Sequence, residues 1–315
     1  MDARDALRGL VRQLPVIGKP YRQRDELRAI ERELWQTPGH FYSPIPSRSE
    51  LQSREQVVFG EPPGELPGIR LNEAGQRATL ERLAEQLRDE PQLIEGWPGR
   101  RYSFDNPAFS YCDALVWHAM LRLLRPKRVI EVGSGHSSCV LLDTNNSHLD
   151  DSVACTFIEP YPELLYRLMQ PEDRESARVI TSNLQDVPIE TFTALESGDV
   201  LFIDSSHVSK TDSDVNYAFF EILPRLAQGV HVHVHDVFYP FEYPKEWVYQ
   251  GRAWNEAYLL RAFLQYNHTF EIMLWNSWVE RQRRSWLEEL MPLALRHAPE
   301  ASPPTSAQSI WLVRV

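Results

Sequence analysis

The segment Glu131-Val132-Gly133-Ser134-Gly135 closes a short apolar run with an acidic residue and continues into two closely spaced glycines. This is the pattern of a ligand-binding turn. Glycine at such a turn lets the backbone approach a ligand closely. The third glycine of a dinucleotide fingerprint is replaced here by Ser137 or Ser138, so the turn alone is a weak signal. Glu159 ends the next apolar run, about 20 residues on, where nucleotide-binding α/β units place a carboxylate for the ribose hydroxyls. The spacing predicts a nucleotide-binding turn.

A second group of reactive side chains follows another apolar run, in Leu201-Phe202-Ile203-Asp204-Ser205-Ser206-His207. Open α/β sheets bind ligands at the carboxyl ends of their strands, so we expect Asp204 and His207 at the ligand-binding edge. Histidine titrates near neutral pH, which makes His207 the candidate general base for removing a proton from a substrate.

A third group is the run 230–236, in which three histidines alternate with valines before Asp236. Alternate side chains of a strand share one face, but only His235 and Asp236 lie near the carboxyl end of this strand. We therefore expect His235 and Asp236 to be the functional pair. His231 and His233 are expected to be hydrogen-bonded beneath a helix.

The elements that must position these groups alternate between strand and helix from Ser110 onward. Helices are expected at 111–124, 138–143, 162–169, 214–226, 255–266 and 285–296, and strands at 128–132, 154–158, 178–181, 199–203, 229–235, 270–275 and 309–315. This order predicts an α/β fold, a Rossmann-like, doubly wound and mainly parallel sheet with an antiparallel last strand.

The chain is expected to divide near Gly99. Residues 1–99 read as an N-terminal helical and extended cap with helices at Gln23–Trp35 and Asn72–Glu90 and an extended segment at Phe41–Ser47. Residues 100–315 form the catalytic domain. The loop 238–247 follows the third group, and its aromatic residues suggest contacts with a ring-shaped substrate.

Taken in this order, the residues resemble the class I S-adenosylmethionine-dependent methyltransferases over about 102–315, in particular small-molecule or sugar methyltransferases of bacterial biosynthetic clusters. The resemblance implies that the turn faces the methionine part of S-adenosylmethionine, that Glu159 binds the ribose, and that Gln185 and Asp186 hold the adenine edge. The cofactor-binding residues implied are Glu131, Gly133, Ser134, Gly135, Ser137, Glu159, Gln185, Asp186 and Asp204.

The resemblance leaves a metal ion open. In the catechol-type branch an aspartate at the place of Asp204 ligates a divalent cation, and two adjacent side chains, often Asp-Asn or Glu-Asp, complete the site. This chain has His235-Asp236 there. A set of Asp204, His235 and Asp236, with or without His207, would suit Mn²⁺, Fe²⁺ or Zn²⁺ better than Mg²⁺. The alternative is a metal-free site in which His207 is the base and Asp236 orients it or the substrate.

Composition narrows the class of partner. The chain has 315 residues, a net charge of −11 and a pI near 5.4, which disfavours a large nucleic-acid contact surface. No apolar run is long enough to span a bilayer, and three cysteines without metal-like spacing indicate a reducing, cytoplasmic setting. The expected partner is a small molecule. Aromatic residues in Phe41–Ile45 or the C-terminal helix could mediate a dimer, so the oligomeric state stays open.

The first hypothesis is therefore O-methylation of a sugar or secondary-metabolite hydroxyl, with His207, Asp204 and Asp236 as the catalytic residues. An N-methyltransferase is an alternative, since His207 could also deprotonate an ammonium. Another is an iron-dependent oxygenase or hydroxylase on the same scaffold, because two histidines and a carboxylate resemble an iron site with open positions. A non-enzymatic binding module is disfavoured by the acid, imidazole and aromatic loop at one sheet edge.

Overall fold

The computed structural model describes residues 23, 32, 34–90, 100–299 and 303–315. The chain forms two compact units, residues 1–60 and 61–315. The helix expected at Gln23–Trp35 falls almost entirely outside the described residues. The first unit contains the short helices α3 (Arg48–Ser53) and α4 (Glu55–Val58), neither of which has a buried residue. Residues 41–47, expected to be extended, include turns and bends.

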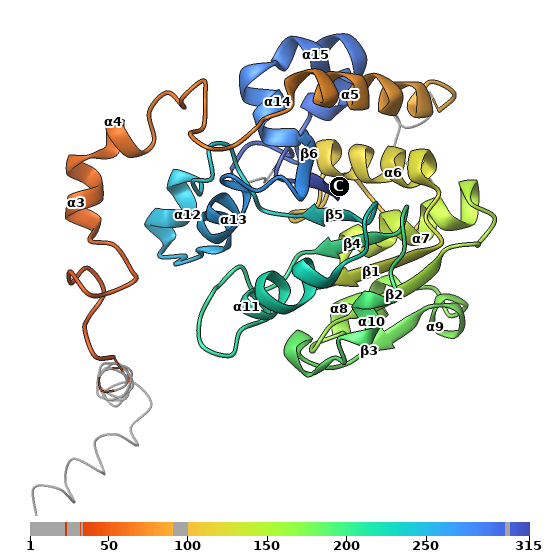
Figure 1. Ribbon diagram of the computed structural model, residues 1–315, viewed down its shortest axis with the longest axis horizontal. Helices are drawn as coiled ribbons and strands as arrows, with labels where there is room; N and C mark the ends of the chain where they lie inside the picture. Colours follow the sequence, from red (N-terminus) through yellow and green to blue (C-terminus); the bar gives the residue numbers. More distant parts are fainter. Residues whose placement is uncertain (1–22, 24–31, 33, 91–99, 300–302) are drawn as a thin grey trace, which may run out of the picture. The chain divides into compact units, whose positions relative to one another are not determined.

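The second unit is built on a seven-stranded sheet of order β3-β2-β1-β4-β5-β7-β6. All described neighbours in the sheet pair in parallel up to β5, and β7 runs antiparallel to both β5 and β6. The predicted α/β fold with an antiparallel last strand is confirmed (Figure 1). The strands are β1 (Arg128–Val132), β2 (Ala154–Ile158), β3 (Arg178–Ile180), β4 (Val200–Ile203), β5 (His231–Val234), β6 (Phe270–Trp275) and β7 (Ile310–Arg314).

Apolar side chains on both faces bury the central strands. Every residue of β4 is buried, and only the first residue of β1 and of β5 is partly exposed. A parallel sheet covered on both faces has such near-continuous apolar runs, which is why these strands could be located from the sequence. Their carboxyl ends meet at one edge, which places the turn after β1 beside the segments after β4 and β5.

Helices cover the sheet, and several differ from those expected. The helix expected at 214–226 is a short α-helix followed by a π-helical segment, 218–222, and a 3-10 turn. The helix expected at 285–296 is α15 followed by a 3-10 turn. The helices of this unit are α5 (Glu73–Leu87), α6 (Tyr111–Leu124), α7 (His136–His148), α8 (Glu163–Leu168), α9 (Asp173–Ser176), α10 (Glu190–Thr193), α11 (Asp214–Tyr217), α12 (Lys245–Gln250), α13 (Glu256–Leu264), α14 (Asn276–Gln282) and α15 (Arg284–Leu290).

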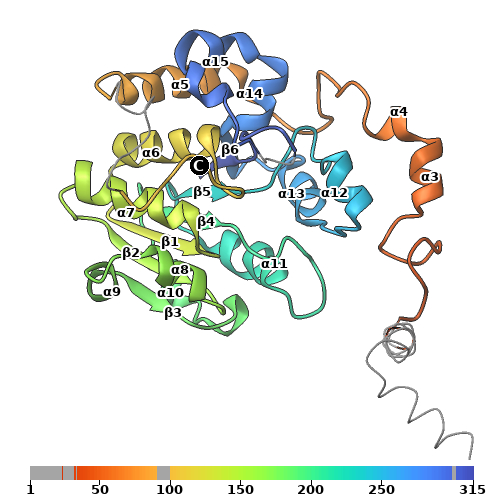
Figure 2. The ribbon, with the colours of Figure 1, turned by 180° about the vertical axis from the view of Figure 1, so that it is seen from behind.

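Helix α5 packs within the second unit, against α6 and β6. The Nδ2 of Asn72 donates to the carbonyl of Ile272 at 2.9 Å, and the backbone N–H of Trp275 donates to Oε1 of Gln76 at 2.8 Å. Figures 1 and 2 show α5, α14 and α15 gathered beside β6. These hydrogen bonds and packing contacts bind α5 to the sheet, and the compact division falls after Gly60.

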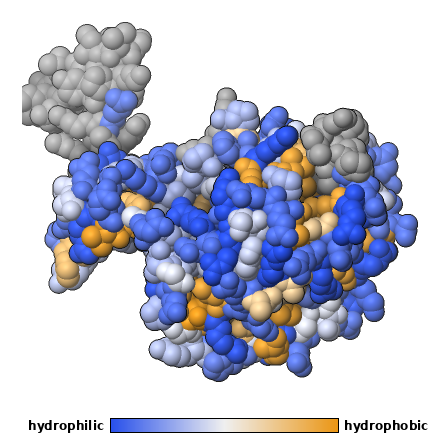
Figure 3. All heavy atoms as spheres, turned by 90° about the horizontal axis from the view of Figure 1, so that it is seen from above, coloured by the Kyte–Doolittle hydropathy of each residue, from blue (hydrophilic) through white to orange (hydrophobic). Residues whose placement is uncertain are grey.

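One face of the second unit is mainly polar. On the face shown in Figure 3, hydrophilic side chains predominate and the hydrophobic ones lie in separate small patches. Among the described residues, none of the helices has both the length and the apolar character needed to cross a lipid bilayer.

Candidate active site

The turn after β1 depends on one glycine. Gly133 has a φ of +76°, and its N–H donates to the carbonyl of Ile158 at 2.9 Å. A Cβ at this position would lie 1.7 Å from the backbone oxygen of Asp204. Only glycine combines this conformation with so close an approach. The turn after β1 and the end of β4 are therefore in direct backbone contact.

Glu131 lies buried against the start of α7. Its side chain is fully buried, and the hydroxyl of Ser137 donates to its Oε1. Burial raises the pKa of Glu131 to about 8, although hydrogen bonds from Ser137 and Ser138 oppose the shift. At neutral pH this carboxyl is mostly protonated, so it supports the turn as a neutral hydrogen-bonding group.

A cavity of about 440 Å³ lies between the turn and the ends of β2 and β4, in the usual size range of small-molecule sites. Of the residues expected to bind the cofactor, Gly133, Glu159, Gln185 and Asp204 line it. The other expected residues do not line it: Glu131, Ser134, Gly135, Ser137 and Asp186. The backbone of Ser134 and Gly135 instead leads into α7, with the Gly135 N–H donating to Ser138 Oγ at 3.1 Å.

Two backbone hydrogen bonds fix the carboxylate of Glu159. Its Oε2 accepts from the N–H of Ser134 at 3.0 Å, and its Oε1 accepts from the N–H of Tyr161 at 2.9 Å. A carboxylate has about four acceptor positions, so each oxygen can still accept a hydroxyl. This geometry suits a vicinal diol such as a ribose. Across the cavity, Nε2 of Gln185 donates to the carbonyl of Asp212 at 2.8 Å.

Carboxylates surround the imidazole of His207. Its Nε2 lies 3.4 Å from Oδ1 of Asp204 and 3.4 Å from Oδ2 of Asp236, and its Nδ1 contacts Oε2 of Glu256 at 2.8 Å. Burial by itself lowers the pKa of His207, but the three carboxylates outweigh it and raise that pKa to about 10. The imidazole is therefore protonated at neutral pH in this arrangement. A protonated imidazole donates hydrogen bonds and cannot accept a substrate proton.

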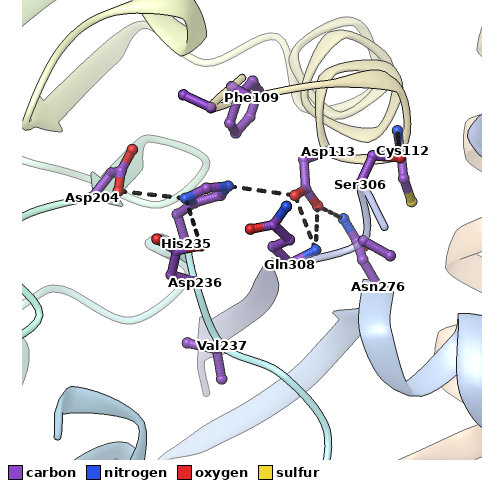
Figure 4. A network of polar contacts seen from close by, with 12 residues as sticks. Phe109, Cys112, Asp113, Asp204, His235, Asp236, Val237, Asn276, Ser306 and Gln308 are labelled. Carbon is purple, nitrogen blue, oxygen red and sulfur yellow. Dashed lines mark hydrogen bonds and ion pairs between the residues drawn. The ribbon is translucent and has the colours of Figure 1, made fainter. Parts of the chain in front are cut away.

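His235 belongs to a second buried network, drawn in Figure 4. Its Nδ1 lies 3.4 Å from Oδ1 of Asp204, and its Nε2 lies 3.4 Å from Oδ2 of Asp113. Asp113 also accepts from the N–H of Gln308 at 2.9 Å and from Nδ2 of Asn276 at 2.6 Å. His235 thus links the end of β4 to the first turn of α6.

The row of histidines on β5 serves two different purposes. His235 reaches Asp204, whereas His233 is fully buried between two aromatic rings, with ring centroids 4.0 Å from Phe202 and 4.3 Å from Trp311. The expectation that His233 is hydrogen-bonded is wrong, because neither ring nitrogen has a hydrogen-bond partner among the described residues. Burial lowers its pKa well below the usual value, so His233 packs as a neutral aromatic ring.

Three of these side chains can share a cation. One ligand atom each from Asp204, His207 and Asp236 lie within 4.8 Å of one another. This group contains His207, whereas His235 of the expected ligand set lies beside it, with Nδ1 3.4 Å from Oδ1 of Asp204 and 3.6 Å from Oδ1 of Asp236. Glu256 holds the far nitrogen of His207, as a carboxylate does behind a metal-bound histidine. The contacts of 3.4 Å and the unpartnered Oδ1 of Asp236 fit a site that a cation could complete.

A second cavity, of about 250 Å³, meets the first at Asp204. Asp236 and His235 line it from the sheet, and Trp247, Arg252 and Trp254 line it from α12 and the segment after it. The aromatic loop expected to contact a substrate therefore supplies Trp247 to this cavity. The remaining lining residues come from the segments 106–110 and 303–308.

The sequence alone did not identify Asp113 or Glu256 as residues of the site. The structure places both against the histidines of the site. Each begins a helix, where acidic residues are common for reasons unrelated to catalysis, so neither position carried a distinguishing signal.

A further buried cluster lies away from both cavities. Glu90 contacts His118 at 2.9 Å, His148 at 3.0 Å and the guanidinium of Arg122. Burial lowers the pKa of His148 to about 4, so this histidine is neutral. Because Arg122 already balances the charge of Glu90, we interpret the cluster as a packed hydrogen-bond network that joins α6 to α7.

Comparisons with known proteins point to one family. A family model described as a methyltransferase domain matches residues 130–237. An uncharacterised protein of Archaeoglobus fulgidus is 33% identical over 205 residues, covering 60% of this chain and 89% of that protein. Similar solved structures include the SAH-bound Podospora anserina methyltransferase PaMTH1, with 14% identity, 73% and 92% coverage of the two chains and a TM-score of 0.38. The apo structure of CmcI-N160 has 17% identity, 84% and 95% coverage and a TM-score of 0.39.

The sheet order and the glycine turn are those of a nucleotide-binding α/β fold, with two cavities that adjoin at Asp204. The methyltransferase-domain match spans β1 to the end of β5 and therefore includes the turn, Glu159, Asp204 and Asp236. The chain therefore contains a methyltransferase domain, as expected for an S-adenosylmethionine-dependent enzyme.

Proposed function

We propose that this protein transfers the methyl group of S-adenosylmethionine to a hydroxyl of a small molecule, such as a sugar or another secondary metabolite. The observation that carries the proposal is the shared position of Asp204, which lines both the 440 Å³ cavity and the 250 Å³ cavity. Methyl transfer is an in-line displacement, so donor and acceptor must meet at one place from two sides. Asp204 marks that place.

The larger cavity would hold the cofactor. Glu159 would accept the ribose hydroxyls, and Gln185 would lie at the adenine edge, as the family resemblance implies. Gly133 packs against the backbone of Asp204, so the turn and the end of β4 together form one wall of this cavity. The cofactor supplies the electrophilic methyl group, and the protein supplies alignment.

The acceptor hydroxyl must lose a proton, and the site favours Asp236 over His207 as the group that receives it. His207 has a pKa of about 10 and already carries a proton at neutral pH. Burial raises the pKa of Asp236, although His235 and His207 lower it, and its Oδ1 has no hydrogen-bond partner in the described structure. A carboxylate with a raised pKa is a better base than an ordinary one.

A divalent cation fits this chemistry. Asp204, His207 and Asp236 offer two carboxylates and an imidazole, a donor set better suited to Mn²⁺, Fe²⁺ or Zn²⁺ than to Mg²⁺. A bound cation would lower the pKa of the acceptor hydroxyl. Nε2 of His207 would lose its proton when the cation binds, and Glu256 would keep Nδ1 of the imidazole in place. The methyltransferase-domain match disfavours the alternative of an iron-dependent oxygenase.

The test is a pair of titrations on chelator-treated protein, with S-adenosylhomocysteine and with Mn²⁺. We expect micromolar binding of S-adenosylhomocysteine, near −8 kcal/mol. Mn²⁺, followed by the loss of its free-ion EPR signal, should bind the wild type and should bind Asp236→Asn and His207→Gln at least tenfold more weakly. The exposed residue His268 supplies the control His268→Gln, which should bind like the wild type. Absence of S-adenosylhomocysteine binding would refute the cofactor site, whereas absence of Mn²⁺ binding alone would leave the metal-free route through Asp236.

A further inference from the structure

The 250 Å³ cavity is lined by a positively charged side chain, that of Arg252, as well as by the carboxylates of Asp204 and Asp236. Arg252 lies two residues after the end of α12 and lines this cavity with an exposed side chain. Among the lining residues it is the one Lys or Arg. Within the described parts of the chain, its guanidinium has no ion pair and no side-chain hydrogen bond. The positive charge is therefore available to a ligand.

Two indole rings hold this guanidinium in place. The Cζ of Arg252 lies 4.2 Å from the ring centroid of Trp247 and 5.0 Å from that of Trp254. The two indoles meet edge to face, with centroids 5.2 Å apart. The backbone N–H of Arg252 donates to the carbonyl of Trp247 at 3.1 Å. Stacking on two aromatic rings limits the rotamers of the side chain, so its fork of donors is pre-organised.

Trp254 also connects Arg252 to His207 of the candidate active site. Its ring centroid lies 4.5 Å from that of His207, on which Asp204 and Asp236 converge. The same indole therefore contacts the guanidinium and the imidazole. A ligand in this cavity would have carboxylates close to the atom that receives the methyl group and a cation beside another of its substituents.

We propose that the methyl acceptor is a compact ring that carries an anionic group, a carboxylate or a phosphate, and that Arg252 binds this anion and fixes which hydroxyl is methylated. The inference rests on the proposed function, because it assigns the smaller cavity to the acceptor. A guanidinium binds both anions through two parallel hydrogen bonds. The volume of about 250 Å³ is below the ~300–1,000 Å³ of sites for drug-sized ligands, which limits the acceptor to roughly one substituted ring.

Charge also sets the orientation of the methyl acceptor in the smaller cavity. Without a cation Asp204 and Asp236 would repel an anion, and a divalent cation would only balance their two charges, whereas the charge of Arg252 has no carboxylate beside it in the described structure. The anionic group is therefore held at Arg252, and a hydroxyl elsewhere on the ring is turned toward Asp236. A neutral ring of the same shape lacks this orienting contact and would bind more weakly and in more than one pose.

The experiment compares anionic rings with neutral rings of similar shape in the presence of saturating S-adenosylhomocysteine. The pairs are 3-hydroxybenzoate with 3-hydroxybenzamide and glucuronate with glucose, and phenyl phosphate is the phosphate probe. Binding is measured by saturation-transfer NMR titration. We expect the anion of at least one pair, or phenyl phosphate, to bind the wild type at least fivefold more tightly than the neutral rings. Which anion is preferred distinguishes carboxylate from phosphate.

The variants separate charge from packing. Arg252→Gln should reduce the preference below twofold, and Arg252→Lys should retain part of it. Arg174→Gln is the matched control, because Arg174 is also exposed and stacked, 5.2 Å from the ring of Tyr166, but lines neither cavity. It should keep the full preference.

Binding of S-adenosylhomocysteine is recorded for every variant. A wild type that binds S-adenosylhomocysteine but shows no preference for anions, or an Arg252→Gln variant that keeps the preference, overturns this inference alone. A wild type that does not bind S-adenosylhomocysteine overturns the proposed function, and the inference with it.

Discussion

Replacing Gly133 by alanine is the sharpest test of how the turn and the end of β4 build the cofactor cavity. The new Cβ would lie 1.7 Å from the backbone oxygen of Asp204, so the two segments must separate by more than 1 Å. Two hydrogen bonds would be strained, from Gly133 N–H to Ile158 O at 2.9 Å and from Asp204 N–H to Val132 O at 2.8 Å. Each is worth about 0.5–1.5 kcal/mol. The left-handed conformation adds about 1–2 kcal/mol, so unfolding free energy should fall by about 2–5 kcal/mol.

Gly198→Ala is the matched control. Gly198 has a φ of +92°, but a Cβ there would meet nothing within 4 Å. It should lose only the conformational part, about 1–2 kcal/mol. Urea unfolding followed by circular dichroism measures both losses, and calorimetry measures S-adenosylhomocysteine affinity. Gly133→Ala should bind at least tenfold more weakly, and Gly198→Ala within twofold of the wild type. Equal losses of stability and affinity in the two variants would refute the close-contact argument.

Two further predictions concern the acidic residues Glu159 and Glu131. Glu159→Gln should weaken S-adenosylhomocysteine binding by about 10–100-fold, because hydrogen bonds to a charged group are worth about 1.5–3 kcal/mol. Glu163 is exposed, and the control Glu163→Gln should have no effect on binding. Unchanged binding by Glu159→Gln would contradict the assignment of Glu159 to the ribose. Glu131 has a pKa of about 8 in the folded protein, above its unfolded value of 4.5, so the stability that it contributes is complete below about pH 4.5 and is lost as the pH rises through 8. Urea unfolding at pH 5.5, 7 and 8.5 should show a shallower loss for Glu131→Gln than for the wild type, and parallel profiles would show that Glu131 is ionised in the fold.

The sequence predicted those parts of the fold that local pattern determines. The bounds of β1 and β2 match the expected runs, since buried parallel strands are continuous apolar segments. Helix bounds were less predictable. The expected helix at 138–143 is the middle of α7, which extends to His148 through polar residues such as Asn145 and Asn146 that lower local helix propensity. Tertiary packing outweighs that propensity, as Asn145 Nδ2 donates to the carbonyl of Val153 at 3.3 Å.

The site was predictable where it lies along one strand and its turn, and not where it is assembled from distant elements. Asp204 and His207 are three residues apart, so their proximity could be inferred directly. Glu256, 49 residues from His207 in the sequence, reaches its Nδ1 through the start of α13. The resulting pKa of about 10 depends on carboxylates from three separate segments. The ordinary pKa of a histidine could not anticipate this shift, because Asp236 and Glu256 are distant from His207 in the sequence.

Backbone conformation supports the assignment of both His207 and Asp236 to the chemistry. Each has a positive φ, +58° for His207 and +57° for Asp236, although neither is glycine. A side chain in this left-handed region costs about 1–2 kcal/mol, and the surrounding contacts must supply that energy. Asp236 comes two residues after β5 and His207 four residues after β4, so the strain sits where the strands release the chain into the site. Such strain is retained where it turns a side chain toward a place that regular structure cannot reach, and here it brings Nε2 of His207 to 3.4 Å from both Asp204 and Asp236.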